Sequence, residues 1–292
     1  MKAPRLTQKV QQMIQQAHEL AERNQHASIQ SIDLFMGAAL VRKGTLREMH
    51  DLIEPNLDEI EGLIKSLSPE ASSGIWIESF SKPPSLNTLK IWNASIDIMK
   101  RYNQTFLNEG HIIKAFYSLL SDHPELESGL KVVRKERIMQ TVASSRDLTV
   151  DLLNRDWSFK EDGQVEISFV DIKEKDALLS WSQRHFGENW SETLRCAFQS
   201  PAPHIPILKA KMGGEMVGFA AYDVYMNKKG VFGPMGILPT ARHQGVGRKL
   251  LYAALQSMKE KRYMYVVLKE AGPIEFYEQT CNAKLIPLED WK

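Results

Sequence analysis

The fold of the second half of this chain is decided by one stretch: Ile237-Leu238-Pro239-Thr240-Ala241-Arg242-His243-Gln244-Gly245-Val246-Gly247-Arg248. An apolar, strand-like run ends in a basic turn with two glycines, and an amphipathic helix begins directly after it. The first N–H groups of a helix have no partner within the helix, and the helix dipole favours an anion there. Glycine lets the backbone approach a phosphate closely. The stretch therefore predicts a strand–turn–helix that binds a pyrophosphate.

The spacing of the glycines separates several kinds of phosphate loop. A P-loop needs Lys followed by Ser or Thr after its last glycine, whereas Arg248 and Lys249 follow Gly247 here. A dinucleotide-binding fingerprint needs a third glycine, and this turn has only two. The remaining pattern is Arg-x-x-Gly-x-Gly, at Arg242, Gly245 and Gly247. A glycine-rich turn without a ligand is the alternative, because such turns are common in α/β proteins.

This pattern resembles the acetyl-CoA pyrophosphate loop of the GCN5-related N-acetyltransferases, the GNAT family. Pro239 before the loop and Phe276-Tyr277-Glu278 near the C-terminus add to the resemblance, which covers roughly residues 164–292. It implies an α/β GNAT fold with a mixed, splayed sheet, and acetyl-CoA as cosubstrate. The residues that the resemblance assigns to acetyl-CoA are Ile237, Leu238, Arg242, His243, Gln244, Gly245, Val246, Gly247 and Arg248.

The resemblance also implies the chemistry, which is acyl transfer to a primary amine. Backbone groups near 236–238 are expected to meet the pantetheine and the acetyl carbonyl, and a backbone N–H would polarise the thioester. Tyr277 matches the tyrosine that protonates the departing thiolate in this family; the alternative is that Tyr277 only packs. A lysine-like amine, with a pKa of about 10.4, must lose a proton before it attacks. The candidate bases are Asp223, Glu215, Glu270 and His204, among which we favour Asp223 because aromatic residues flank it.

The first half of the chain has helical periodicity and an internal repeat. Val10, Met13, Ile14 and Ala17 have the spacing of an amphipathic helix. A proline- and serine-rich stretch at 66–85 interrupts the helices, and the apolar pattern then repeats with a shift of 78 residues. Two four-helix units in tandem are the simplest interpretation, because self-similarity usually means one unit used twice.

This half resembles the Clp N-terminal domain, the helical module that precedes the ATPase rings of Clp chaperones. The matching stretches are Leu6-Thr7, Asn24-Gln25-His26 and Ser31-Ile32-Asp33-Leu34. The resemblance implies a protein-binding module without chemistry of its own, so we expect a protein partner at residues 1–143. A purely structural module and a dimerising module, which would make the chain a homodimer, remain alternatives.

A chain of 292 residues favours two domains. We predict an all-α double four-helix repeat at 1–143, a partly helical linker at 144–163, and the GNAT domain at 164–292. The strands expected in the GNAT domain are Val165–Asp171, Ile205–Met212, Met216–Tyr225, Val231–Ile237, Tyr263–Leu268 and Ala283–Ile286. The expected helices are Lys175–Phe186, Ser191–Phe198, Val246–Glu260 and Ile274–Gln279.

Composition excludes several other classes of function. The formal net charge is +1, and neither half is basic, so we expect no nucleic-acid partner. The sequence has no apolar leader and no run of about 20 apolar residues, so we expect a cytoplasmic protein without a membrane partner. Cys196 and Cys281 lack metal-ligand spacing and the histidines do not converge, so we expect no metal.

The sequence therefore predicts an acetyl-CoA-dependent N-acetyltransferase that modifies a primary amine, on a protein recruited by the helical domain. A small-molecule amine acetyltransferase is one alternative. A non-catalytic CoA-binding adaptor or sensor is the other.

Overall fold

The computed structural model describes residues 3–159, 163–199 and 204–288, which form two compact units. The first unit is built on the chain up to Ser144, and the second extends from Ser145 to Pro287. Each unit encloses its own apolar core. Within the described ranges, no helix combines the length and apolar character needed to cross a membrane.

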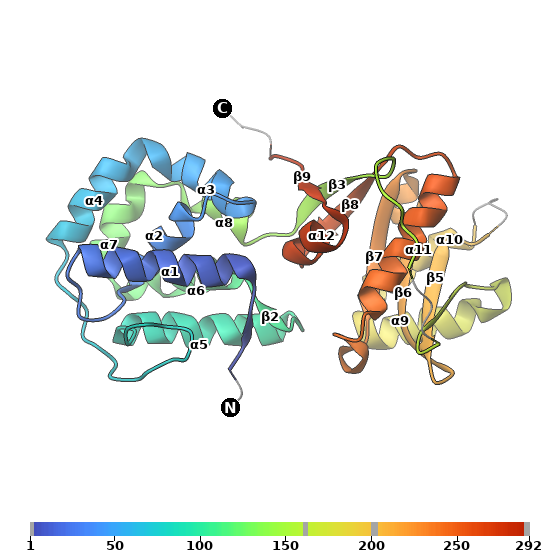
Figure 1. Cartoon of the computed structure of the whole chain (residues 1–292), viewed down its shortest axis with the longest axis horizontal. Coiled ribbons are helices and arrows are strands. Elements are labelled where there is room, and N and C mark those ends of the chain that lie inside the picture. Colours follow the sequence, from blue (N-terminus) through green and yellow to red (C-terminus); the bar gives the residue numbers. More distant parts are fainter. Residues whose placement is uncertain (1–2, 160–162, 200–203, 289–292) are drawn as a thin grey trace. The chain divides into compact units, whose positions relative to one another are not determined.

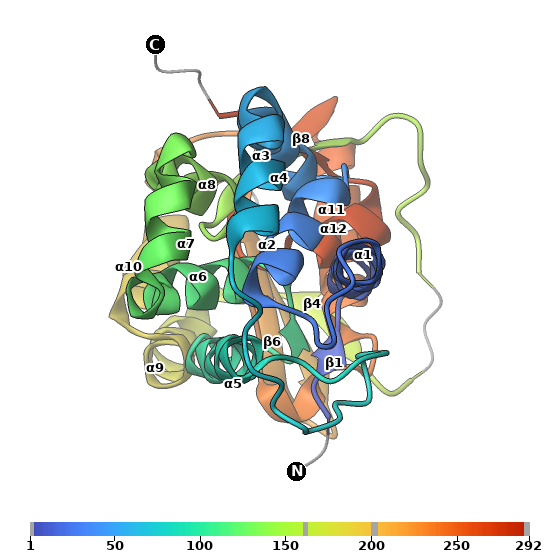
Figure 2. The same ribbon diagram turned by 90° about the vertical axis from the view of Figure 1, so that its left-hand side faces the viewer.

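The first unit consists of eight α-helices within its described residues, joined by short 3₁₀ turns. Figure 2 shows α1 and α5, the first helices of the two repeats, both viewed end-on. The apolar face of each amphipathic helix turns inward, and side chains such as Val10, Met13 and Ile112 are fully buried. The helices are α1 (Gln8–Arg23), α2 (Ser31–Leu40), α3 (Thr45–Ile53), α4 (Leu57–Ser66), α5 (Leu86–Arg101), α6 (Glu109–Leu119), α7 (Pro124–Gly129) and α8 (Lys135–Val142).

Short backbone pairings join the two repeats. Strands β1 (Arg5–Leu6) and β2 (Phe106–Leu107) pair in parallel, with Leu6 opposite Leu107. A parallel bridge also links Ile29 to Pro84. A shift of 78 residues converts one pair into the other, so the start of each repeat pairs with the connection between the first two helices of the other repeat.

The helix caps show the same repeat. The hydroxyl of Thr7 accepts from the Val10 N–H at the start of α1, and the hydroxyl of Ser85 accepts from the Thr88 N–H at the start of α5. Thr7 and Ser85 are also 78 residues apart. The repeat predicted from apolar spacing is therefore present in capping and backbone pairing as well.

The second unit is a seven-stranded mixed sheet with helices on both faces (Figure 1). The strand order is β4-β5-β6-β7-β8-β3-β9; β7 and β8 are parallel and the other neighbours are antiparallel. Helices α9 (Lys175–Phe186) and α10 (Glu188–Ala197) cover one face, while α11 (Val246–Glu260) and α12 (Ile274–Cys281) pack on the other. The strands are β3 (Arg146–Asp151), β4 (Glu166–Phe169), β5 (Ile207–Met212), β6 (Glu215–Tyr222), β7 (Val231–Ile237), β8 (Tyr265–Ala271) and β9 (Lys284–Leu285).

The predicted fold class, an all-α repeat followed by an α/β unit with a mixed sheet, is confirmed. One element was predicted wrongly. The segment 144–163, which we expected to be a partly helical linker, contains β3, which lies inside the sheet between β8 and β9. Leu148 and Val150 are fully buried while Thr149 and Asp151 are not, so the segment has the two-residue period of a strand. Only three residues separate the end of α8 at Val142 from the start of β3 at Arg146.

Candidate active site

The phosphate-loop stretch forms the predicted strand–turn–helix. Strand β7 ends at Ile237, a 3₁₀ turn covers Pro239–Ala241, and α11 begins at Val246. Gly245 is the N-cap of α11 in the left-handed region, with φ +79°, and a Cβ there would point into open space. No side chain caps this helix end and no acidic residue lies in its first turn. The backbone N–H groups of the first turn therefore face a sterically open site that favours an anion.

The charged and polar members of the loop have different surroundings. Arg242 is half-buried, its Nε donates to the Ile237 carbonyl at 3.3 Å, and burial lowers the pKa of its guanidinium. Gln244 donates from its amide to the Thr240 carbonyl at 3.0 Å. The side chain of Val246 is buried in the core, so only its backbone can face a ligand. His243 and Arg248 lie on either side of the helix start.

An opening separates β7 from β8 beside this loop. The two parallel strands pair only at Val231 with Val267 and at Phe232 with Leu268. Beyond these pairs, residues 233–237 of β7 have no partner on β8, although both strands are described in full. We call this gap, between 233–237 and 269–271, the interstrand opening. It is the splay expected for the sheet.

A β-bulge lies at the start of the interstrand opening. Met235 pairs with Ala220 and Phe232 with Tyr222, so β7 has one residue more than β6 between these pairs. The extra length falls at Gly233, with φ +125°, and Pro234, which has no N–H to donate. The bulge thus ends the regular strand at the point where β7 leaves β8.

The hydrogen-bond direction along β7 decides which backbone groups face the opening. The Leu238 N–H donates to the Val217 carbonyl at 2.9 Å, and the Leu238 carbonyl accepts from the Ala241 N–H. Because the direction alternates along an antiparallel ladder, the backbone groups of Ile237 and Met235 point away from β6 into the opening. We expected Leu238 at the ligand, but its backbone N–H and carbonyl both have protein partners. We did not name Met235 from the sequence, although the two-residue period of a strand puts Met235 on the same side as Ile237.

Helix α12 brings Phe276 and Tyr277 to the same region. A Cβ at Gly247 would lie 3.5 Å from the Phe276 ring, so α12 packs against the first turn of α11. Tyr277 packs edge-on against Phe276, with ring centroids 5.0 Å apart, and only 7% of it is exposed. Burial raises the pKa of the Tyr277 hydroxyl well above its usual value. The phenol therefore stays protonated at neutral pH.

The sequence of this unit matches a known family. Residues 168–282 match the Acetyltransferase (GNAT) family. The chain carries a GNAT domain. No curated protein sequence matches the chain.

Several solved structures are similar to parts of the chain. The GCN5-related glucosamine N-acetyltransferase region of a fungal β-N-acetylglucosaminidase has 15% identity and a TM-score of 0.42 over 49% of this chain and 20% of that protein. A GCN5-related N-acetyltransferase from Sphaerobacter thermophilus has 13% identity and a TM-score of 0.39, over 58% of this chain and 64% of that one. The N-terminal domain of ClpD from Arabidopsis thaliana has 11% identity and a TM-score of 0.38, over 47% of this chain and 91% of that one. The chain thus spans a fifth of the fungal protein and most of the ClpD domain.

An aromatic wall lies on the face of the GNAT sheet opposite α11. A Cβ at Gly236 would lie 2.7–3.0 Å from three carbons of the Phe186 ring, so the ring at the end of α9 rests directly on the β7 backbone. Phe186 stacks on Trp190 of α10, with centroids 5.2 Å apart, and packs edge-on against Phe219. Residue 236 must therefore be glycine for this wall to reach the strand.

The favoured base, Asp223, is engaged in the structure of the GNAT domain. Its carboxylate accepts from the Gly230 N–H at 2.8 Å and from the Tyr263 hydroxyl at 3.0 Å. The ammonium groups of Lys229 and Lys261 lie 3.9 and 3.6 Å from it. The Asp223 carboxylate therefore stabilises the loop that connects β6 with β7.

The other three candidate bases differ in their surroundings. Glu215 begins β6 at an exposed hairpin, and the His204 ring stacks on Phe169 at 5.2 Å. Glu270 lies in β8 at the interstrand opening, where it accepts from the Tyr225 hydroxyl at 2.8 Å.

Among residues 3–159, 163–199 and 204–288, no three His, Cys, Asp or Glu side chains group as metal ligands would.

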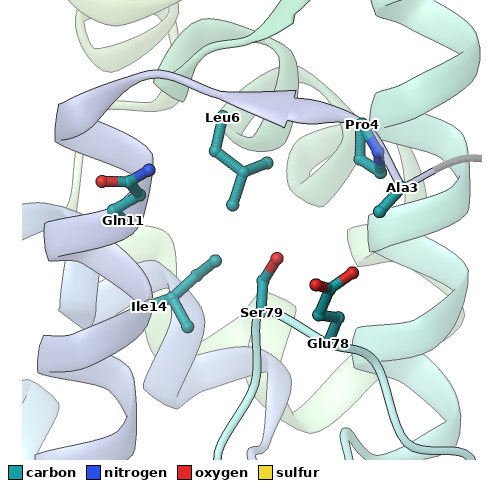
Figure 3. Close-up of a pocket in the computed structure, with 7 residues that line it drawn as sticks. All are labelled: Ala3, Pro4, Leu6, Gln11, Ile14, Glu78 and Ser79. Atoms are coloured by element: carbon teal, nitrogen blue, oxygen red, sulfur yellow. The ribbon is translucent and has the colours of Figure 1, made fainter.

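The helical unit has a hollow of its own (Figure 3). It has a volume of about 470 Å³ and lies between β1, α1 and the loop that carries Glu78 and Ser79. Its walls combine apolar side chains, such as Leu6 and Ile14, with the polar Gln11 and Glu78.

Proposed function

We propose that the GNAT domain transfers the acetyl group of acetyl-CoA to a primary amine. The observation that carries this proposal is the interstrand opening, which leads directly to the uncapped N-terminus of α11. The pyrophosphate binds the first-turn N–H groups of α11 and the charge of Arg242. The pantetheine lies in the opening, where its amides pair with the backbone of β7. The loop from 242 to 248 and Ile237 thus hold the donor.

Two groups of this chain act on the thioester. The N–H of Met235 points into the opening beside the bulge, and it polarises the acetyl carbonyl and stabilises the oxyanion that forms. The amine nitrogen attacks the carbonyl carbon after it has lost a proton to a base. The C–S bond then breaks, Tyr277 gives its hydroxyl proton to the departing thiolate, and the second proton that the nitrogen loses restores the phenol.

The test is release of free thiol from acetyl-CoA with a panel of amines: a lysine peptide, a peptide with a free N-terminus, glucosamine and an aminoglycoside. Turnover with any of them supports the proposal. Tyr277→Phe should reduce kcat by about 10²-fold, within the range for general acids, and leave acetyl-CoA affinity unchanged. Acetyl-CoA binding without turnover on any amine would instead support a sensor. An absence of binding would refute the loop assignment.

We further propose that residues 1–143 bind the protein that carries the acceptor amine. A binding module on the same chain raises the effective concentration of a bound protein at the GNAT domain. The hollow between β1, α1 and Glu78–Ser79 supports a peptide as its ligand. Ser79→Trp, which fills the hollow, should lower kcat/KM for a protein acceptor and leave kcat/KM for glucosamine unchanged. Equal rates on the protein acceptor would exclude recruitment through this hollow.

A further inference from the structure

Strand β8 carries its own irregularity at the interstrand opening. Arg146 pairs with Ala271 and Leu148 with Leu268, so β8 has one residue more than β3 between these pairs. The bulge falls at Lys269 and Glu270, directly after the last pair between β7 and β8. Glu270 has φ +51°, a conformation that residues other than glycine rarely adopt. Strained positions of this kind are common at functional sites, where the surrounding structure holds the backbone in place.

Contacts from two other elements hold Glu270 in this conformation. Its backbone N–H donates to the Oδ1 of Asp147 on β3 at 2.9 Å, and the neighbouring Lys269 Nζ donates to Oδ2 at 2.7 Å. The hydroxyl of Tyr225 donates to Glu270 Oε1 at 2.8 Å. The side chain is otherwise exposed, and Oε2 has no protein partner among the described residues. The carboxylate is therefore oriented by one oxygen and accessible through the other.

We call the face of the sheet that α9 and α10 cover the acceptor side. The contacts of β7 and η5 place the Glu270 carboxylate on this side. Tyr225 belongs to the 3₁₀ turn η5 (Tyr225–Asn227), which contacts both β7 and α10. The Lys269 carbonyl lies 4.0 Å from the position of a Cβ on Gly233, so the two bulges face each other across the opening. The pyrophosphate end of the donor belongs to α11 on the other face. An amine that reaches the thioester from the α9–α10 face meets Glu270.

We propose that Glu270 is the general base of the acetyl transfer, with Tyr225 and Asp147 as positioning residues. This inference rests on the proposed function. Oε2 takes one proton from the acceptor ammonium, and the freed lone pair forms the C–N bond to the acetyl carbon. The C–S bond breaks and its electron pair leaves with sulfur. The nitrogen loses its second proton as the amide forms, and the thiolate takes one proton, so the step releases one proton overall.

The other carboxylates do not fit this role. Asp223 already accepts two hydrogen bonds and lies beside two lysine ammonium groups, so its charge is compensated within the fold. Glu215 starts β6 next to an exposed turn, and its partner in the β5–β6 pairing is Met212. Glu270 is the candidate that combines access, orientation and a place at the opening.

The test compares Glu270→Gln with Glu215→Gln in the full chain, using whichever panel amine the wild type acetylates. Gln keeps an oxygen for the Tyr225 hydroxyl but cannot accept the proton. We expect kcat/KM to fall by about 10²–10⁴-fold for Glu270→Gln, with acetyl-CoA affinity within twofold of wild type, and no change for Glu215→Gln. Glu270→Asn, which tolerates a positive φ, should show the same loss and controls for backbone strain.

The pH profile separates a base from a structural residue. The groups that face the carboxylate are Tyr225 from η5, Asp147 from β3 and Lys269 from β8 itself. At high pH the solvent deprotonates the amine, so the deficit of Glu270→Gln should shrink between pH 7 and pH 10. A deficit of equal size at every pH, or a wild-type rate in both Glu270 variants, would overturn the assignment while the acetyltransferase function stands. A wild type that acetylates no amine would overturn both.

Discussion

The two glycines of the phosphate loop should respond to alanine with opposite signs. At Gly245, with φ +79°, a Cβ meets no atom within 4 Å, so the only cost to the fold is the left-handed backbone, about 1 kcal/mol. At Gly247, in the first turn of α11, a Cβ makes ordinary contact with Phe276 at 3.5 Å. Alanine stabilises a helix relative to glycine by about 0.5 kcal/mol. The difference between the two variants is therefore about 1.5 kcal/mol.

Differential scanning calorimetry of the full chain measures this difference. For a unit of this size, 1 kcal/mol corresponds to a shift in Tm of roughly 2–4 °C, so the variants should melt about 5 °C apart. Titration calorimetry with acetyl-CoA gives the second readout. Gly245→Ala should weaken binding at least tenfold, because its methyl group points into the open site, whereas Gly247→Ala should bind within twofold of wild type. Shifts of Tm in the same direction would refute the backbone argument. Unchanged affinity in Gly245→Ala would refute the loop as the phosphate site.

A fragment 145–292 should fold, whereas 164–292 should not, because it lacks β3, the strand that lies between β8 and β9 and pairs with both; circular dichroism distinguishes the two. Gly236→Ala should destabilise the GNAT domain by about 1–3 kcal/mol in guanidinium denaturation, because its Cβ displaces the Phe186 ring; a neutral effect would mean that the aromatic wall moves freely. Burial lowers the pKa of His111 to about 4, and its Nδ1 accepts from the Asn108 N–H, so below pH 6.5 the unfolded state binds a proton that the folded state refuses. Stability should fall by up to about 3 kcal/mol between pH 6.5 and pH 4, and His111→Gln, which can keep the cap, should flatten this slope.

Local patterns in the chain were enough to predict most elements of the GNAT domain. The helices at Lys175–Phe186 and Val246–Glu260 have the predicted bounds, because amphipathic spacing and a glycine at the helix start are properties of neighbouring residues. The 78-residue repeat was visible for the same reason. The GNAT family could be recognised from the phosphate loop, because that pattern consists of a helix end and of glycines that are close in sequence.

Contacts between residues that are far apart in the sequence decided the elements and side-chain environments that local patterns did not predict. Arg146–Asp151 is a strand because β8 and β9 lie on either side of it, and nothing in six residues identifies partners more than a hundred positions away. Asp223 lies between two tyrosines in the sequence and Glu270 does not, yet lysines compensate the charge of Asp223, whereas Glu270 accepts from the Tyr225 hydroxyl and is exposed at the interstrand opening. The sequence by itself determined the strand–turn–helix of the phosphate loop, because a helix N-terminus is a local structure. Only the tertiary structure decided where Glu270 lies, because the two bulges that face each other belong to different strand pairs.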